Sequence, residues 1–168
     1  MSDKKFIYLT VVITMLILVG FATKAMAQGT SEIRFKGWGI RAGLSSDPDQ
    51  VYGGVHLDLG ELIEDVRFRP TVEFGLGDDQ KVLQVLAEVH QVFSKFRVCK
   101  PYLGAGLGLT YINYDDDHLG DDSVTEGSVV LIGGIETELS QAVKLFFEFK
   151  VGLANEDPEM KFGVGLSW

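Results

Sequence analysis

Carboxylates are concentrated in one short stretch in the second half of this chain. This acidic cluster consists of Asp115, Asp116, Asp117, Asp121 and Asp122, with His118 between them. Calcium and magnesium are hard cations that prefer carboxylate oxygens, so the cluster is a candidate site for a divalent cation. Its spacing does not match the calcium loop of an EF-hand. The alternative is a solvated acidic loop without a bound ion, because runs of like charge usually repel and stay in water.

Two of the three histidines, His56 and His90, lie in segments where polar and apolar residues alternate. His56 is two residues from Asp58, and His90 is two residues from Glu88, so each pair would share one face of a strand. Nucleophilic catalysis also needs a nucleophile within reach of the imidazole and an acid to orient it. Neither strand face offers a serine. We therefore predict no catalytic residues, no cofactor and a non-enzymatic protein.

Alternation of apolar and polar residues recurs in eight segments separated by turn-forming residues. The predicted strands cover residues 37–45, 51–60, 66–77, 82–93, 101–113, 128–139, 143–154 and 160–168. Period two is typical of a strand with one apolar face. Most of these segments are close to the ~9–11 residues with which a tilted strand crosses a bilayer. The pattern predicts an all-β protein, an eight-stranded antiparallel up-and-down transmembrane β-barrel.

The same alternation would suit a soluble barrel with its apolar face inward, so the polar faces have to decide the orientation. These faces are rich in glycine, which has no evident purpose on a solvated surface. Inside a narrow eight-stranded barrel, glycines make room for long charged side chains. We therefore predict that the polar faces point inward and form a filled, ion-paired interior. The inward charged set comprises Arg41, Arg67, Arg69, Lys144, Lys150 and Lys161 with Asp58, Glu73, Glu88, Glu136, Glu138 and Glu148.

Hairpin lengths predict two of the charge pairings. The short turn at residues 78–79 brings Arg69 opposite or diagonal to Glu88. The turn after Leu139 brings Lys144 beside Glu136 or Glu138. A catalytic or conducting site is the alternative use of such an interior.

The first and third strands each raise a question about the backbone. Ile33 and Phe35 are out of phase with residues 37–45, so either a bulge near Gly37 resets the alternation or the strand begins only after Lys36. Pro70 lies inside the third strand, where it has no N–H to donate to the ladder.

The N-terminal segment predicts export. Lys4 and Lys5 precede an apolar run over residues 6–22, and residues 25–27 read Ala-Met-Ala, the small-x-small pattern of a signal-peptidase site. We predict a cleaved signal peptide at residues 1–27 and a barrel domain at residues 28–168. A transmembrane anchor is the alternative, but the run is shorter than the ~20 residues of a membrane-spanning helix.

The charge and cysteine content exclude some partners and bonds. The whole chain carries a net charge of −9, and residues 28–168 are more acidic still because the leader is basic. Nucleic acid is not an expected partner, since phosphate binding needs a basic face. The single cysteine, Cys99, has no partner for an intrachain disulfide.

The final nine residues form an uninterrupted alternation that ends in a tryptophan. They resemble the C-terminal assembly signal of bacterial outer-membrane barrels, which ends in an aromatic residue. The resemblance implies recognition by the barrel assembly machinery through Phe162, Val164, Leu166 and Trp168. An apolar strand at a free terminus also needs a partner on both edges, and a closed barrel provides two.

The segment Lys100-Pro-Tyr-Leu-Gly-Ala-Gly-Leu-Gly108 is similar to the recurrent Pro-Tyr-x-Gly-x-Gly-x-Gly strand of the OmpA/OmpX-type family of small outer-membrane barrels, and Gly133-Gly134-Ile135-Glu136 extends the likeness. The resemblance implies location in the cell outer membrane, contact with outer-membrane lipid and lipopolysaccharide, and a monomer. It says little about activity, because one fold hosts many functions.

These observations favour a structural role in the envelope or surface contacts made by acidic loops. With both termini in the periplasm, the long connection at residues 113–127 would face outward, as the longer loops of such barrels do. Two alternatives stay open, an outer-leaflet lipid-modifying enzyme and a small-solute, porin-like channel.

Overall fold

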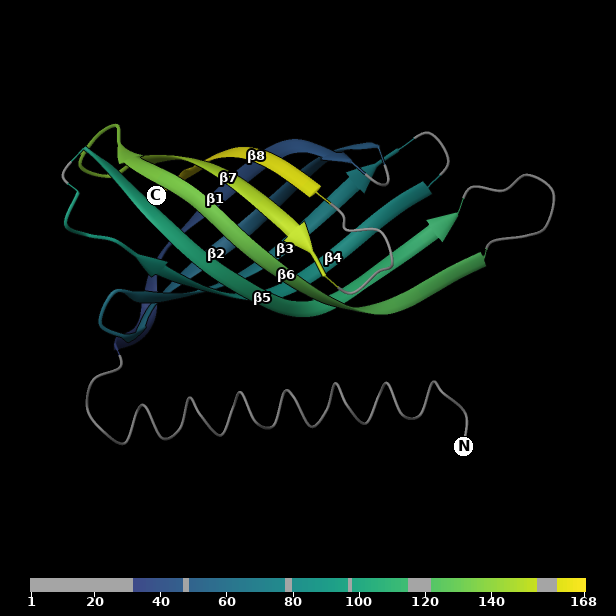
Figure 1. The fold of residues 1–168 in the computed structure, drawn as a ribbon, viewed down its shortest axis with the longest axis horizontal. Coiled ribbons are helices and arrows are strands. Elements are labelled where there is room, and N and C mark those ends of the chain that lie inside the picture. The colour runs from purple at the N-terminus through teal and green to yellow at the C-terminus, as the bar shows by residue number, and fades with distance from the viewer. Residues whose placement is uncertain (1–31, 47–48, 78–79, 97, 115–121, 154–159) are drawn as a thin grey trace.

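The computed structural model describes residues 32–46, 49–77, 80–96, 98–114, 122–153 and 160–168, and these residues form one closed β-barrel. The strands are β1 (Glu32–Ser46), β2 (Gln50–Ile63), β3 (Val66–Leu76), β4 (Gln80–Val92), β5 (Cys99–Tyr114), β6 (Asp122–Glu138), β7 (Lys144–Gly152) and β8 (Met160–Ser167). Each strand pairs antiparallel with its sequence neighbours, and β8 pairs back onto β1 (Figure 1). The predicted eight-stranded up-and-down barrel is confirmed. No helix in the described residues has the length and apolar character needed to cross a membrane.

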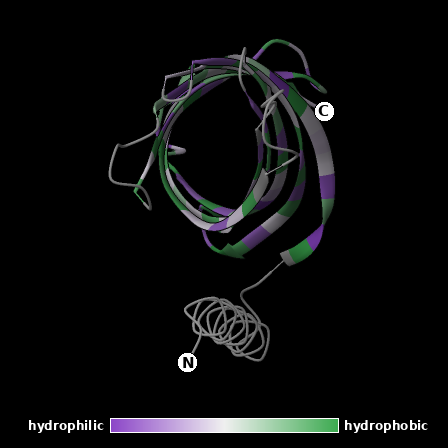
Figure 2. Ribbon diagram, turned by 90° about the vertical axis from the view of Figure 1, so that its right-hand side faces the viewer, coloured by the Kyte–Doolittle hydropathy of each residue, from purple (hydrophilic) through white to green (hydrophobic). Residues whose placement is uncertain are grey.

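The predicted orientation of the two faces is also confirmed. Apolar residues such as Leu44 and Phe162, each 63% exposed, lie on the outer wall, whereas Arg69 and Glu88 are 2% and 0% exposed. Along each strand, hydrophilic and hydrophobic residues alternate around the ring (Figure 2). A belt of exposed apolar side chains around a charged interior is the arrangement of a barrel whose solvent is lipid.

The start of β1 contains a bulge, the first of the two alternatives predicted for this strand. Pairing with β2 begins at Glu32, and the register shifts between Ile33 and Gly37. From Gly37 onward the pairing with β2 is regular up to Ser45. Ile33 and Phe35 are exposed, as Trp38 and Ile40 are, so the outward face changes from odd to even positions within this irregular stretch, which explains why the alternation before Gly37 is out of phase.

The β5–β6 hairpin extends further than the sequence predicts. The strand expected at residues 128–139 begins at Asp122 instead, and Tyr114 pairs with Asp122 at the far end of the ladder. Residues 122–127 are thus a paired strand and not part of the predicted loop at 113–127. The sequence did not predict this extension because it contains polar residues such as Thr125 and Glu126. Pairing in a β-hairpin can continue beyond the apolar stretch.

Pro70 lies where the β2–β3 ladder is interrupted. Regular pairing stops at His56 and Thr71 and resumes at Glu61 and Arg67, so β2 has one residue more than β3 in between. Gly60, in this bulge, has a φ of 83°, a left-handed conformation that glycine adopts without steric cost. Towards β4, Pro70 keeps a regular partner. The missing N–H of the proline therefore falls at a bulge, where the ladder does not require it.

Candidate functional site

The centre of the barrel holds a network of buried charges contributed by five strands. This central cluster consists of Arg41 of β1, Glu73 of β3, Glu88 of β4, Glu148 and Lys150 of β7, and Lys161 of β8. Its side chains are at most 6% exposed. Three cations face three carboxylates, so the cluster carries no net charge. All six belong to the predicted inward set.

Lys150 and Arg41 hold the three carboxylates together. The Lys150 ammonium donates to Glu73 Oε1 and to Glu88 Oε1, both at 2.5 Å. Arg41 Nη1 donates to Glu148 Oε1 at 2.5 Å and to Glu73 Oε1 at 3.3 Å. Because every charge has an oppositely charged partner in contact, the burial of these groups is compensated.

Neutral polar side chains complete the network. Tyr102 O–H donates to Glu148 Oε2 at 2.9 Å, and Lys161 Nζ donates to Gln84 Oε1 at 2.9 Å. His90 Nε2 lies 3.1 Å from Glu88 Oε2. The sequence pattern placed Glu88 and His90 on one inner face, but nothing in it linked Tyr102 to Glu148, which is 46 residues away.

A second group of charges lies towards the end of the barrel where β2 turns into β3 and β6 into β7, here called the turn end. This turn-end cluster consists of Asp58, Arg67, Arg69, Glu136 and Lys144. Arg67 Nη1 donates to both oxygens of Glu136, at 2.8 and 2.9 Å. Arg69 Nη2 is 4.0 Å from Asp58 and 3.9 Å from Glu136.

The predicted pairings hold for the backbone and only in part for the side chains. Arg69 is the register partner of Glu88, yet the acids nearest its guanidinium in the structure are Asp58 and Glu136. Lys144 pairs in register with Glu138, and its Nζ lies 3.9 Å from Glu136. Long side chains inside a tilted barrel reach past their register partners to groups on other strands.

The prediction that Glu138 faces the packed interior is wrong. Its side chain is 59% exposed and accepts a hydrogen bond from Lys100 Nζ at 2.7 Å. Glu138 is the last residue of β6, so it lies at the rim, where water solvates a carboxylate. Without Glu138, five of the six predicted inward acids remain, against the six predicted inward cations.

Glycines on the inner faces make room for large side chains on other strands. A methyl group at Gly134 would overlap Tyr102, one at Gly163 the hydroxyl of Tyr52, and one at Gly165 a side chain of β7. Inward glycines thus make room for large side chains, as predicted, although the side chains at these three positions are aromatic rings and not charged chains. The barrel is filled at these positions, because the space beside each of these three glycines contains part of a ring.

Comparison with known proteins gives the architecture a context. No protein-family model matches the sequence, and no curated protein matches it significantly. Solved structures do match. Neisserial surface protein A superposes with a TM-score of 0.65 at 16% identity, covering 78% of this chain and 93% of that one. The fold is that of a small outer-membrane barrel.

Two further barrels support this assignment. The N-terminal β-barrel domain of Pseudomonas aeruginosa OprF has a TM-score of 0.60 at 14% identity, with 79% of this chain and 96% of that one covered. The Yersinia pestis attachment invasion locus protein, Ail, has a TM-score of 0.56 at 10% identity, with 78% and 95% covered. With its apolar outer wall, the chain has the fold of the small integral outer-membrane barrels.

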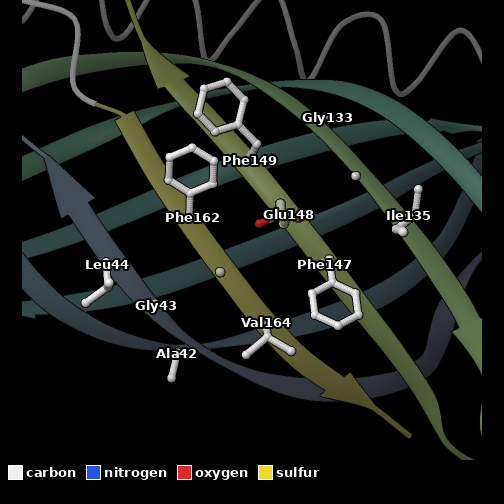
Figure 3. A pocket seen from close by; sticks show the side chains of 12 residues that line it. Ala42, Gly43, Leu44, Gly133, Ile135, Phe147, Glu148, Phe149, Phe162 and Val164 are labelled. Carbon is white, nitrogen blue, oxygen red and sulfur yellow. The ribbon is translucent and has the colours of Figure 1, made fainter.

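The outer wall of the barrel contains an apolar groove of about 530 Å³. Phe149 of β7 and Phe162 of β8 lie next to each other along it, with ring centroids 4.7 Å apart, and Phe147 and Val164 follow further along the same strands (Figure 3). Gly133, an outward-facing residue of β6, leaves part of the groove open. Acyl chains are the surrounding medium for this wall, so the groove needs no protein partner.

The structure brings together one pair of catalytic residue types that the sequence did not predict. His56 Nε2 and Ser167 Oγ are 3.0 Å apart, and Ser167 is 111 residues away along the chain. His56 Nδ1 has no hydrogen-bond partner among the described residues, so no acid orients the ring as in a catalytic triad. The serine was missed because β8 lies beside β1 only when the barrel closes; His56 and Ser167 are then both register partners of Gly39 on β1, and they meet over this glycine.

Two groups are candidates for a metal ion. Of the predicted acidic cluster, Asp115, Asp116, Asp117 and Asp121 lie outside the described residues, and the described part of Asp122 is its backbone at the start of β6. Inside the barrel, one ligand atom from each of Glu88, His90 and Glu148 lies within 4.8 Å of the others. Their carboxylates already bind Lys150 and Arg41, and a dication would be repelled by these cations.

Proposed function

We propose that the protein is a non-enzymatic outer-membrane barrel that contributes to envelope integrity or to surface contacts. The observation that carries the proposal is the salt-bridged centre of the lumen. Lys150 of β7 bonds to Glu73 of β3 and Glu88 of β4, and Arg41 of β1 bonds to Glu148. Side chains from opposite walls thus meet in the middle, where a channel or a substrate would need open space.

The channel alternative is tested by electrical recording. Purified protein in planar bilayers should give no steady conductance, because the side chains of the central cluster meet in the middle of the lumen. As a positive control, Glu73→Ala combined with Lys150→Ala removes two of the side chains that meet there, and this variant should show brief conducting events. A reproducible large step from the unmodified protein would overturn the proposal.

The enzyme alternative is tested on the lipid of the membrane that contains the protein. His56 and Ser167 are buried at 1% and 9% exposure, and no acid among the described residues orients His56, so we expect no chemistry from them. Mass spectra of lipid A should be identical from cells with the gene, without it, and with Ser167→Ala. A mass difference that Ser167→Ala abolishes would make the protein a hydrolase.

Envelope and surface roles are distinguished by a deletion strain. Deletion should increase sensitivity to detergent with chelator, and the unmodified gene should restore resistance. A variant with asparagine at the five aspartates of the acidic cluster removes charge and leaves the barrel intact. If it also restores resistance, the role lies in the barrel; if not, it lies in contacts of the acidic loop with lipopolysaccharide or another surface partner. A deletion strain indistinguishable from its parent would contradict both roles.

Assembly and oligomeric state follow from the same proposal. We propose that the barrel assembly machinery recognises the C-terminal strand through Phe162, Val164, Leu166 and Trp168, and that the folded product is a monomer. Deletion of Trp168 should leave more protein in the periplasm, which immunoblots of membrane and periplasmic fractions would measure. Light scattering of the detergent complex should give one chain per micelle.

A further inference from the structure

The guanidinium of Arg69 has two buried donors that no group of the described residues satisfies. Arg69 is 2% exposed, and its Nε and Nη1 atoms have no hydrogen-bond partner among the described residues. The carboxylates of Asp58 and Glu136 lie 4.0 and 3.9 Å from Nη2, beyond hydrogen-bond distance. A buried charged donor without a partner is costly, so such groups are nearly always satisfied by a protein atom, a water or an ion.

The charge around Arg69 favours an anion over a water molecule. The turn-end cluster contains three cations, Arg67, Arg69 and Lys144, but only two carboxylates, and Glu138 at the same end is bonded to a further cation, Lys100. Both oxygens of Glu136 are already bonded to Arg67. The central cluster, by contrast, has as many carboxylates as cations. One monovalent anion would balance the turn end, whereas water would leave the surplus positive charge uncompensated.

The surroundings of Arg69 limit the size of the anion. The Arg69 guanidinium lies 5.8 Å from the centre of the Phe146 ring, and His56 packs edge-on against the same ring at 5.5 Å. His56 Nδ1 is also without a partner. If Nε2 accepts a hydrogen bond from the Ser167 hydroxyl, Nδ1 carries the proton and is one more buried donor. Between these filled walls a monatomic ion is favoured over phosphate or sulfate.

We propose that the turn end of the barrel interior binds one small halide ion, chloride in the cell, on Nε and Nη1 of Arg69. The ion enters from the turn end, where the side chains of Arg67 and Lys144 are 14% and 34% exposed. Its role is to compensate the surplus cation, so the folded barrel binds halide and the unfolded chain does not. Stability then rises with halide concentration.

The first test measures unfolding of the full protein in detergent at fixed ionic strength. Sodium chloride or bromide replaces sodium gluconate stepwise, and the temperature at which the heat-dependent gel shift occurs is recorded. We expect a saturable rise with halide. Arg69→Met should abolish the rise, and Arg69→Lys, which keeps the charge but loses the planar pair of donors, should shift it to higher halide concentration. Lys100→Met, a cation removed from the exposed rim, is the matched control and should keep the full rise.

The second test is direct and does not depend on a variant that folds. Crystals of the unmodified protein grown in bromide should show an anomalous peak within hydrogen-bond distance of Arg69 Nε or Nη1. Equal stability in chloride and gluconate, a halide effect that survives Arg69→Met, or bromide peaks only at exposed lysines would each overturn the proposal. In the first of these cases water satisfies the Arg69 donors.

Discussion

The indole ring of Trp168 stacks on that of Trp38, with ring centroids 4.9 Å apart and an interplanar angle of 23°. The two backbones also exchange hydrogen bonds, Trp168 N–H to Trp38 O at 2.8 Å and Trp38 N–H to Trp168 O at 3.1 Å. The last residue of the chain is thus fastened to β1 at the seam where the barrel closes. No other strand pair in the described barrel joins segments so far apart in the sequence.

The stacked pair predicts a measurable coupling. Trp168→Ala and Trp38→Ala should each destabilise the barrel, and the double variant should lose less than the sum of the two. We expect a coupling energy of about 0.5–1.5 kcal/mol, as for other aromatic pairs. Urea unfolding of the four proteins in lipid vesicles, followed by circular dichroism and gel shift, gives the cycle, because the double variant contains no tryptophan that could report it. Strictly additive losses would mean that the rings do not stabilise the seam.

Because Gly163 packs against Tyr52, we expect a second substitution at Tyr52 to restore the stability that Gly163→Ala loses. Gly163→Ala should destabilise by about 1–3 kcal/mol, as overpacked cores do, because the new methyl overlaps the Tyr52 hydroxyl. The other atoms near this methyl lie at 3.4 and 3.6 Å, so Tyr52→Phe in the same chain should recover most of the loss. Gly127→Ala is the control, since nothing lies within 4 Å of its added methyl. Urea midpoints measure all four proteins; a Gly163→Ala midpoint equal to that of Gly127→Ala would contradict the packing.

Breaking a buried ion pair should destabilise the barrel, whereas breaking an exposed one should not. Glu88→Ala leaves Lys150 and Arg41 with one acceptor fewer at the barrel centre and should cost about 3–5 kcal/mol. Glu138→Ala breaks a pair at the rim, where water replaces the lost partner, and should leave the urea midpoint unchanged. Raising the salt concentration should not reduce the loss in Glu88→Ala, because buried charges are poorly screened. Equal midpoints for the two variants would argue against a packed centre.

Calcium binding by the acidic cluster can be tested by titration, with a variant that lacks the five carboxylates as the control. If Asp115, Asp116, Asp117, Asp121 and Asp122 form a site, calorimetric titration with Ca²⁺ should give saturable heat. The same titration of the variant with asparagine at these five positions should give none, since amides lack the negative charge that a dication needs. Identical heats from the two proteins would leave a solvated acidic loop.

Period-two alternation determined the strand number, the antiparallel barrel and the face that each residue presents. These properties are local, because successive residues of a strand point to opposite sides whatever the strand pairs with. Neighbouring hairpins also set register, as for Arg69 and Glu88. The extent of pairing was less predictable, and β6 begins at Asp122 because a hairpin ladder continues for as long as both chains remain extended.

Only the tertiary structure decided which inward side chains meet across the lumen. Lys150 of β7 reaches Glu73 of β3, and two donors of Arg69 have no partner among the described residues although its register partner is an acid. Such contacts depend on the tilt and stagger of all eight strands together, which rotate each side chain away from its register partner. Alternation specifies the face of a residue, whereas closure of the whole barrel specifies its neighbours across the interior.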